Sequence, residues 1–136
     1  MDIIEVKATR IGASDMFTGT VYIDEITDRL RPSRLRVNTV RFSPGARTAW
    51  HAHALGQTLH VLDGVGLVQA RGGGIMPVRA GDTIYTPPGE WHWHGASSDN
   101  FMTHLAIWEA PESGAESEWG RLVTEEEYSM DRSTFG

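Results

Sequence analysis

Hydrophobic and polar residues alternate in short runs along most of the chain, and glycine, proline or small polar residues separate the runs. Segments that combine this alternation with β-branched and aromatic residues are 17–26, 34–42, 57–64, 64–70, 82–87 and 101–109. Turns are expected at 43–46, 62–66, 71–74, 78–82, 87–90 and 97–100. Short strands with a turn about every ten residues are typical of a β-sandwich or barrel, so the pattern predicts an all-β domain.

The C-terminal part has a different pattern. No ten-residue stretch before residue 110 shows helical periodicity, whereas Thr124 is followed three positions later by Glu127. This spacing has the form of a capping box and predicts a short helix that runs toward Asp131, with its glutamates in a solvated first turn. The chain shows no internal repeat and no linker, so residues 1–136 are expected to form a single domain.

Composition and charge exclude several classes of function. The net charge is −6 and no basic run stands out, so nucleic acid and anionic membranes are not expected as partners. The absence of cysteine excludes disulfides, zinc–thiolate sites, iron–sulfur clusters and thiol nucleophiles. Neither a signal peptide nor an apolar run of ~20 residues is found, and a cytoplasmic location is expected.

All six histidines lie in one part of the chain. They are His51, His53, His60, His92, His94 and His104. Because side chains alternate across a strand, His51 and His53 are expected to share one face, and His92 and His94 are expected to do the same. Two such pairs favour a shared role for these histidines over six unrelated ones.

The same alternation predicts which other residues face the interior. In segment 57–64 it turns Gln57 inward and His60 outward. In segments 34–42 and 101–109 the inward residues are Asn38, Val40, Phe42, His104, Ala106 and Trp108. In a small barrel these residues converge on one interior, where imidazoles are costly unless they are hydrogen-bonded or bound to a metal.

Two longer motifs contain these histidines and resemble the two motifs of the cupins. Residues 45–64 follow the pattern G-x5-H-x-H-x3-4-E-x6-G with Gly45, His51, His53, Gln57 and Gly64, glutamine replacing glutamate. Residues 81–96 follow G-x5-P-x-G-x2-H-x3-N with Gly81, Pro87, Gly89, His92 and Ala96, alanine replacing asparagine. The resemblance implies a jelly-roll β-barrel with one metal ion. Its implied ligands are His51, His53, Gln57 and His92.

A closer resemblance covers more of the chain. FTGTV, PGARTAWHAHALGQTL, PPGEWHWHGA and MTHLAI are similar to small bacterial cupins with hydroxynitrile lyase activity, which use manganese and have glutamine as the fourth ligand. The resemblance implies that His94 and His104 are catalytic. Pocket residues would be Asn38, Val40, Ala106 and Trp108. Trp108 stands where glutamine is expected and narrows the pocket, and His60 replaces an apolar residue.

The neutral Gln57 bears on the chemistry. Three histidines and a glutamine leave a divalent centre at a charge of +2, whereas a carboxylate would lower it. The more positive centre polarises a bound oxygen more strongly, which favours Lewis-acid chemistry over dioxygen activation. Imidazole ligands suit Mn²⁺, Fe²⁺, Ni²⁺ and Zn²⁺, and the resemblance favours Mn²⁺.

The leading hypothesis is a metal-dependent lyase that cleaves a cyanohydrin to an aldehyde and cyanide, or runs the reverse addition. One of His94 and His104 would accept the hydroxyl proton, and the other would protonate cyanide. The alternatives are a cupin dioxygenase that uses iron or manganese and a non-catalytic cupin that binds a small ligand.

The expected partners are a small-molecule substrate and further copies of the chain. Trp50, Trp91 and Trp93 flank the ligand histidines and are expected on the opposite face of the sheet. They are predicted to be core or subunit-interface residues and not a substrate platform. Aromatic residues on the outside of a small barrel favour a homo-oligomer, a dimer or a tetramer.

Overall fold

The computed structural model describes residues 1–27, 29 and 31–129, which form an antiparallel β-structure with a short C-terminal helix. In chain order the elements are β1 (Arg10–Ile11), β2 (Phe17–Thr18), β3 (Val21–Glu25), β4 (Leu35–Phe42), β5 (Arg47–Thr48), β6 (His51–His53), β7 (Gln57–Ala70), β8 (Met76–Arg79), β9 (Thr83–Thr86), β10 (His92–Ala96), β11 (Met102–Glu109), β12 (Ser117–Trp119) and α1 (Glu125–Ser129). The predicted all-β fold is confirmed.

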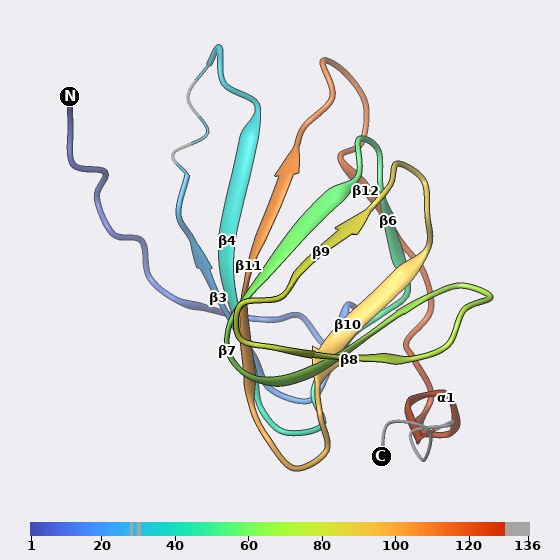
Figure 1. The fold of residues 1–136 in the computed structure, drawn as a ribbon. Coiled ribbons are helices and arrows are strands. Elements are labelled where there is room, and N and C mark those ends of the chain that lie inside the picture. Colours follow the sequence, from blue (N-terminus) through green and yellow to red (C-terminus); the bar gives the residue numbers. More distant parts are fainter. Residues whose placement is uncertain (28, 30, 130–136) are drawn as a thin grey trace.

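Strand β7 joins the two walls of the molecule. Its first half pairs with β11 and β9, and its second half pairs with β10 and β8. The strands follow the order β1-β3-β4-β11-β7-β10-β5-β2, and the sheet curls into a half-barrel as β7 bends from one wall to the other (Figure 1). β6 and β12 extend the wall formed by β10.

The turn predicted at 62–66 is wrong, because β7 runs through it without a break. Gly64 has a φ of 84°, and a side chain at this position would collide with the carbonyl group of Phe101. A side chain at Gly66 would collide with Met102 and Gly95. The two glycines therefore allow neighbouring strands to approach β7 closely at its bend, and they do not reverse the chain.

An apolar cluster lies on the outer face of the sheet, separate from the barrel interior. Its members are Trp50, Leu67, Ile75, Trp93, Val123 and Tyr128, with the partly buried Trp91 packed against them. Trp93 is fully buried and donates its indole N–H to Gln69 at 2.8 Å. Burial of such a side chain contributes on the order of 2–3 kcal/mol. Trp50 and Trp93 are thus core residues on the opposite face of the sheet, and the partly buried Trp91 packs against this cluster.

The C-terminal helix begins with the predicted capping box. The backbone N–H of Glu127 donates to the Thr124 hydroxyl at 3.0 Å, and the Glu127 carboxylate accepts from the Thr124 N–H at 3.0 Å. Tyr128 of this helix reaches back and donates to the carbonyl of Ala96 at 2.7 Å. The sequence therefore predicted both the helix and its cap, and Asp131 lies outside the described residues.

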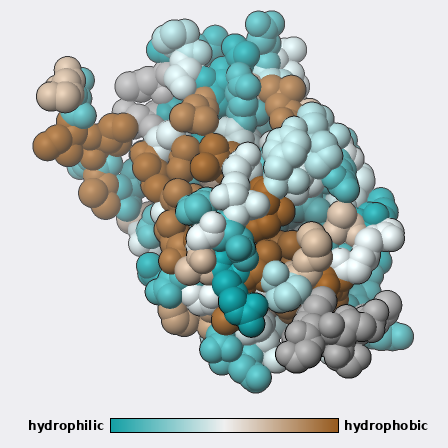
Figure 2. Space-filling view, viewed as in Figure 1, coloured by the Kyte–Doolittle hydropathy of each residue, from teal (hydrophilic) through white to brown (hydrophobic). Residues whose placement is uncertain are grey.

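The aromatic outer face is covered by the C-terminal segment of the same chain. The most exposed apolar side chains include Met1, Ile3 and Val6 of the N-terminal segment, which also exposes Ile4. This segment projects from the body at the upper left of Figure 2, where brown marks hydrophobic residues. The homo-oligomer stays a prediction. The N-terminal segment offers an apolar surface for contact between copies of the chain. No described helix is long and apolar enough to span a bilayer.

Candidate metal centre

Three histidines come together inside the half-barrel. His51 and His53 lie on β6, and His92 lies on β10 directly opposite His51 in the antiparallel register. All three are buried, and each offers a ring nitrogen that lies within 4.8 Å of the other two. Two neighbouring strands therefore bring together residues that are far apart in the chain.

Backbone carbonyls fix the orientation of two of these rings. His51 donates its Nδ1–H to the carbonyl of Ala49 at 2.9 Å, and His92 donates its Nδ1–H to the carbonyl of Glu90 at 3.0 Å. A carbonyl can only accept, so Nδ1 carries the proton and Nε2 keeps its lone pair in the neutral ring. Metal-binding histidines are commonly oriented in this way.

Gln57 completes the arrangement. Its Oε1 lies 3.2 Å from Nε2 of His92. With the His92 proton on Nδ1, both atoms are acceptors, and two lone pairs that face each other are favourable only when a cation or a proton lies between them. The contact therefore fits a cation that both residues bind.

His53 supplies an independent test of the fit. Neither of its ring nitrogens forms a hydrogen bond of normal geometry, although the ring is buried and the Gln57 side chain lies near it. Burial and the neighbouring His92 lower the pKa of His53 to about 4, so the ring is neutral at pH 7. A buried neutral imidazole without a partner is costly in the metal-free protein and is the form that binds a metal. The donor set thus fits a divalent ion.

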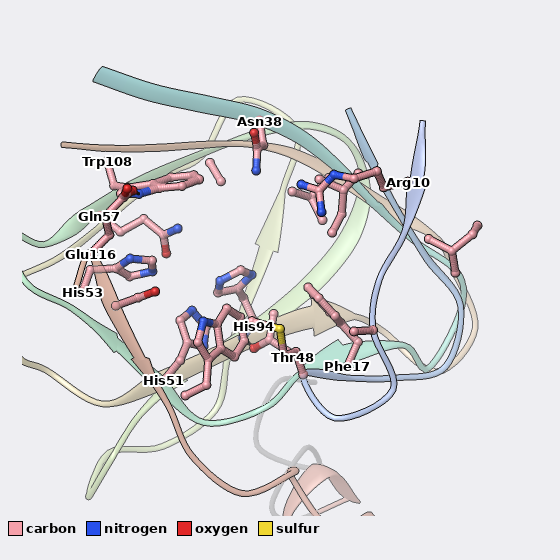
Figure 3. Close-up of a pocket in the computed structure, with 18 of the residues that line it drawn as sticks. Arg10, Phe17, Asn38, Thr48, His51, His53, Gln57, His94, Trp108 and Glu116 are labelled. Carbon is pink, nitrogen blue, oxygen red and sulfur yellow. Dashed lines mark hydrogen bonds between the residues drawn. The ribbon is translucent and has the colours of Figure 1, made fainter. Parts of the chain in front are cut away.

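A cavity of about 490 Å³ adjoins this cluster. The side chains of His51, His53, Gln57 and His94 point toward the same space (Figure 3). Further predicted site residues in its lining are Asn38, Val40, Ala106 and Trp108. His92 and His104 are not among the lining residues, and His60 lies outside the cavity, where its ring contacts the Thr83 hydroxyl at 2.8 Å.

His94 and His104 form a buried pair beside the centre. Nε2 of His104 lies 2.9 Å from Nδ1 of His94, while Nε2 of His94 has no partner. Burial lowers the pKa of both rings, that of His104 to about 4. The ring of Phe42 packs against both, at 5.9 Å from His94 and 5.3 Å from His104. Only His94 reaches the cavity, and His104 contacts it through His94.

The comparison with known families agrees with this geometry. A family model for the cupin domain matches residues 38–108, which is more than half of the chain and includes every histidine described above. The chain belongs to the cupin family.

Two relatives are similar to this cupin over nearly its whole length. The (R)-mandelonitrile lyase of Granulicella tundricola is 46% identical over 122 residues, which cover 90% of this chain and 92% of that protein. The crystal structure of a cupin-like protein from Thermotoga maritima has a TM-score of 0.83 and is 40% identical, covering 94% of this chain and 95% of that one.

A more distant structure shares the fold alone. The polyketide cyclase of Streptomyces resistomycificus has a TM-score of 0.71 at 20% identity, covering 94% of this chain and 90% of that one. The barrel is therefore shared by proteins of dissimilar sequence, and the site residues carry the functional argument.

Two further residues lie at the site, although no pattern in the sequence indicated them. One is in the loop before β12 and the other is on β12 itself. Glu116 lines the cavity and accepts the indole N–H of Trp108 at 2.9 Å, and it also binds Arg36 at 3.3 Å. Although burial raises the pKa of Glu116, hydrogen bonds from Trp108 and Arg36 lower it below its usual value. Trp108 is thus held in place, with its ring 5.8 Å from that of His53.

Trp119 is the second site residue that the sequence did not indicate. Its ring stacks on His51 at 4.4 Å with an interplanar angle of 14°, because β12 pairs with β6 and places Trp119 opposite His51. The segment around β12 has no motif or periodicity that connects it to the histidines. Only the strand pairing makes Glu116 and Trp119 part of the site.

Proposed function

We propose that this cupin is a metal-dependent lyase of the hydroxynitrile lyase type, which cleaves a cyanohydrin to an aldehyde and cyanide and catalyses the reverse addition. The arrangement that carries the proposal is a buried set of three histidines and a glutamine beside a neutral histidine that opens on the cavity. The identity to a mandelonitrile lyase over 90% of the chain supports the reaction class.

His51, His53, His92 and Gln57 would hold the ion, and we propose Mn²⁺. Bound there, a divalent ion would supply Lewis-acid polarisation of the substrate oxygen. The neutral glutamine keeps the charge of the centre at +2, which favours this role.

We assign the proton transfers to His94. For this role its Nδ1–H donates to Nε2 of His104, which leaves the lone pair of His94 Nε2 directed at the cavity. Nε2 accepts the hydroxyl proton while the C–C bond breaks and its electron pair leaves with cyanide. The same proton then passes to cyanide to give hydrogen cyanide, so His104 acts as a positioning residue.

The test is the release of benzaldehyde from (R)-mandelonitrile by protein purified with manganese, with elemental analysis of the same sample. We expect one divalent ion per chain and turnover that a chelator abolishes and manganese restores. Turnover no faster than in buffer, with manganese, iron, nickel or zinc, would overturn the proposal. Oxygen uptake with an aromatic or diketone substrate would instead support a dioxygenase.

Gln57→Glu tests the role of the neutral ligand. A carboxylate still binds the ion but lowers the charge of the centre, so we expect the metal content to be retained and lyase turnover to fall by about tenfold. Metal content and kcat are measured on the same sample. Higher turnover in the variant would contradict the charge argument.

A further inference from the structure

The charges that line the cavity differ in sign from the protein as a whole. The chain has a net charge of −6, yet the cavity lining contains two arginines, Arg10 and Arg29, and a single carboxylate, Glu116. A divalent ion in the proposed site would add further positive charge. The cavity is therefore a positive region inside an acidic protein, which favours an anionic ligand.

Two of these three groups already have partners. Glu116 accepts hydrogen bonds from Trp108 and Arg36, and its carboxylate lies 3.9 Å from Arg29. Arg29 also binds Glu25 at 2.6 Å. The charges of Glu116 and Arg29 are thus compensated within the protein.

Arg10 is different. It lies on β1 directly opposite Ile23 of β3, and Ile23 also lines the cavity. Residues opposite each other in an antiparallel pair project from the same face, so the register turns Arg10 toward the cavity. Figure 3 shows its guanidinium extending inward, on the side away from His53 and Gln57. Among the described residues, Arg10 has no ion pair and no side-chain hydrogen bond.

We propose that the substrate of this site carries a carboxylate group and that Arg10 binds it. The inference rests on the proposed function, in that the cavity is the substrate pocket. A guanidinium offers two parallel N–H donors that match a carboxylate, and one unpartnered cation balances its single charge, whereas a phosphate would need more. Asn38 points into the same space and offers a second polar contact (Figure 3). Arg10 thus selects an anionic cyanohydrin or aldehyde over a neutral one.

The first test measures binding and needs no turnover. 4-Formylbenzoate and 4-formylbenzamide have nearly the same shape, but only the first has a carboxylate. Calorimetric titration of the metal-loaded protein is expected to show about tenfold tighter binding of the carboxylate, which corresponds to ~1.4 kcal/mol. Added salt should reduce this preference, because Arg10 lies at the solvent-exposed rim of the cavity.

Variants assign the preference to one side chain. Arg10→Gln is expected to remove the preference for the carboxylate, and Arg10→Lys to restore part of it, since lysine keeps the charge but not the two parallel donors. Arg41→Gln is the matched control, because Arg41 is an exposed arginine on β4 that does not line the cavity. It should leave the preference unchanged.

Kinetics separate this inference from the proposed function. The ratio of kcat/KM for the carboxylate and carboxamide cyanohydrins of these aldehydes should fall about tenfold in Arg10→Gln. Cleavage of mandelonitrile without any carboxylate preference, or a preference that survives Arg10→Gln, overturns the role of Arg10 and leaves the lyase intact. Binding that depends on Arg10, without cleavage of any cyanohydrin, overturns the lyase and retains the anion site.

Discussion

Buried polar groups occur in two regions of this cupin, and the protein treats them in opposite ways. The C-terminal clasp consists of Arg47, Val123, Glu125 and Tyr128. Arg47 is only 3% exposed, and its Nη2 donates to the carbonyl of Val123 and the carboxylate of Glu125, each at 3.0 Å, so that of its guanidinium nitrogens only Nε has no hydrogen-bond partner. Its guanidinium also lies 4.4 Å from the centre of the Tyr128 ring.

The histidine-lined cavity lacks such compensation. Both ring nitrogens of His53 and Nε2 of His94, which line this cavity, form no hydrogen bond of normal geometry. A protein that satisfies a buried arginine with this many contacts has the means to satisfy an imidazole. The difference indicates that the clasp contributes to folding, whereas the cavity leaves polar atoms without hydrogen bonds, as the proposed metal ion and substrate require.

His53→Ala is the strongest test of this difference. Loss of a ligand should abolish stoichiometric metal binding and lower kcat/KM at least about 100-fold, while the metal-free protein stays folded. Elemental analysis, the mandelonitrile assay and circular dichroism measure the three quantities. His60→Ala, outside the cavity, is the control and should retain metal and activity. A fully active His53→Ala would remove the basis of the metal site.

The pH dependence of stability tests the cost of a buried imidazole. The pKa of His104 is about 4 in the folded protein because of burial, against ~6.5 in an unfolded chain. As the pH falls, His104 is therefore protonated in the unfolded state before it is protonated in the folded state. The stability that neutral His104 provides is complete above about pH 6.5 and is lost as the pH falls toward about 4, a change of ~3 kcal/mol.

His104→Gln isolates this effect. Urea unfolding across that pH range should show a shallower loss of stability in the variant than in the wild type. Parallel profiles in the two proteins would mean that the pKa of His104 is the same in the folded and the unfolded state, which would contradict this prediction.

Arg47→Met tests the clasp. The side chain keeps its volume but loses its hydrogen bonds and the contact of its charge with Tyr128, so the free energy of unfolding should fall by ~2 kcal/mol. Urea denaturation measures the fall, and kcat/KM of the folded protein should not change. Glu125→Gln is the control, because Glu125 is 81% exposed and its removal should cost less than ~1 kcal/mol. Lost activity without lost stability would contradict the division between the two regions.

Trp108→Gln has the smallest expected effect and probes the wall of the cavity. The smaller side chain enlarges the space beside His53, so kcat/KM for a naphthyl cyanohydrin should rise about three- to tenfold relative to mandelonitrile. Glu116→Gln keeps an acceptor for the Trp108 indole and should shift the ratio less. An unchanged ratio in Trp108→Gln would show that the indole does not limit substrate size.

Strand alternation by itself determined which way the central residues face. It predicted that His51, His53 and Gln57 point into one interior and that His60 does not, as the structure has them. This prediction succeeds because the direction of a side chain on a strand depends only on its parity along the chain. The capping box at Thr124 was predictable for a similar reason, since all of its contacts are local.

The tertiary structure alone decided which residues meet across the cavity. Pairing of β12 with β6 brings Trp119 against His51, and pairing of β1 with β3 turns Arg10 inward. The bend of β7 at Gly64, which resembles a turn in the sequence, depends on the close approach of Phe101. Such contacts follow from the register between strands that are distant in the chain, and a register is set by the packing of the whole sheet.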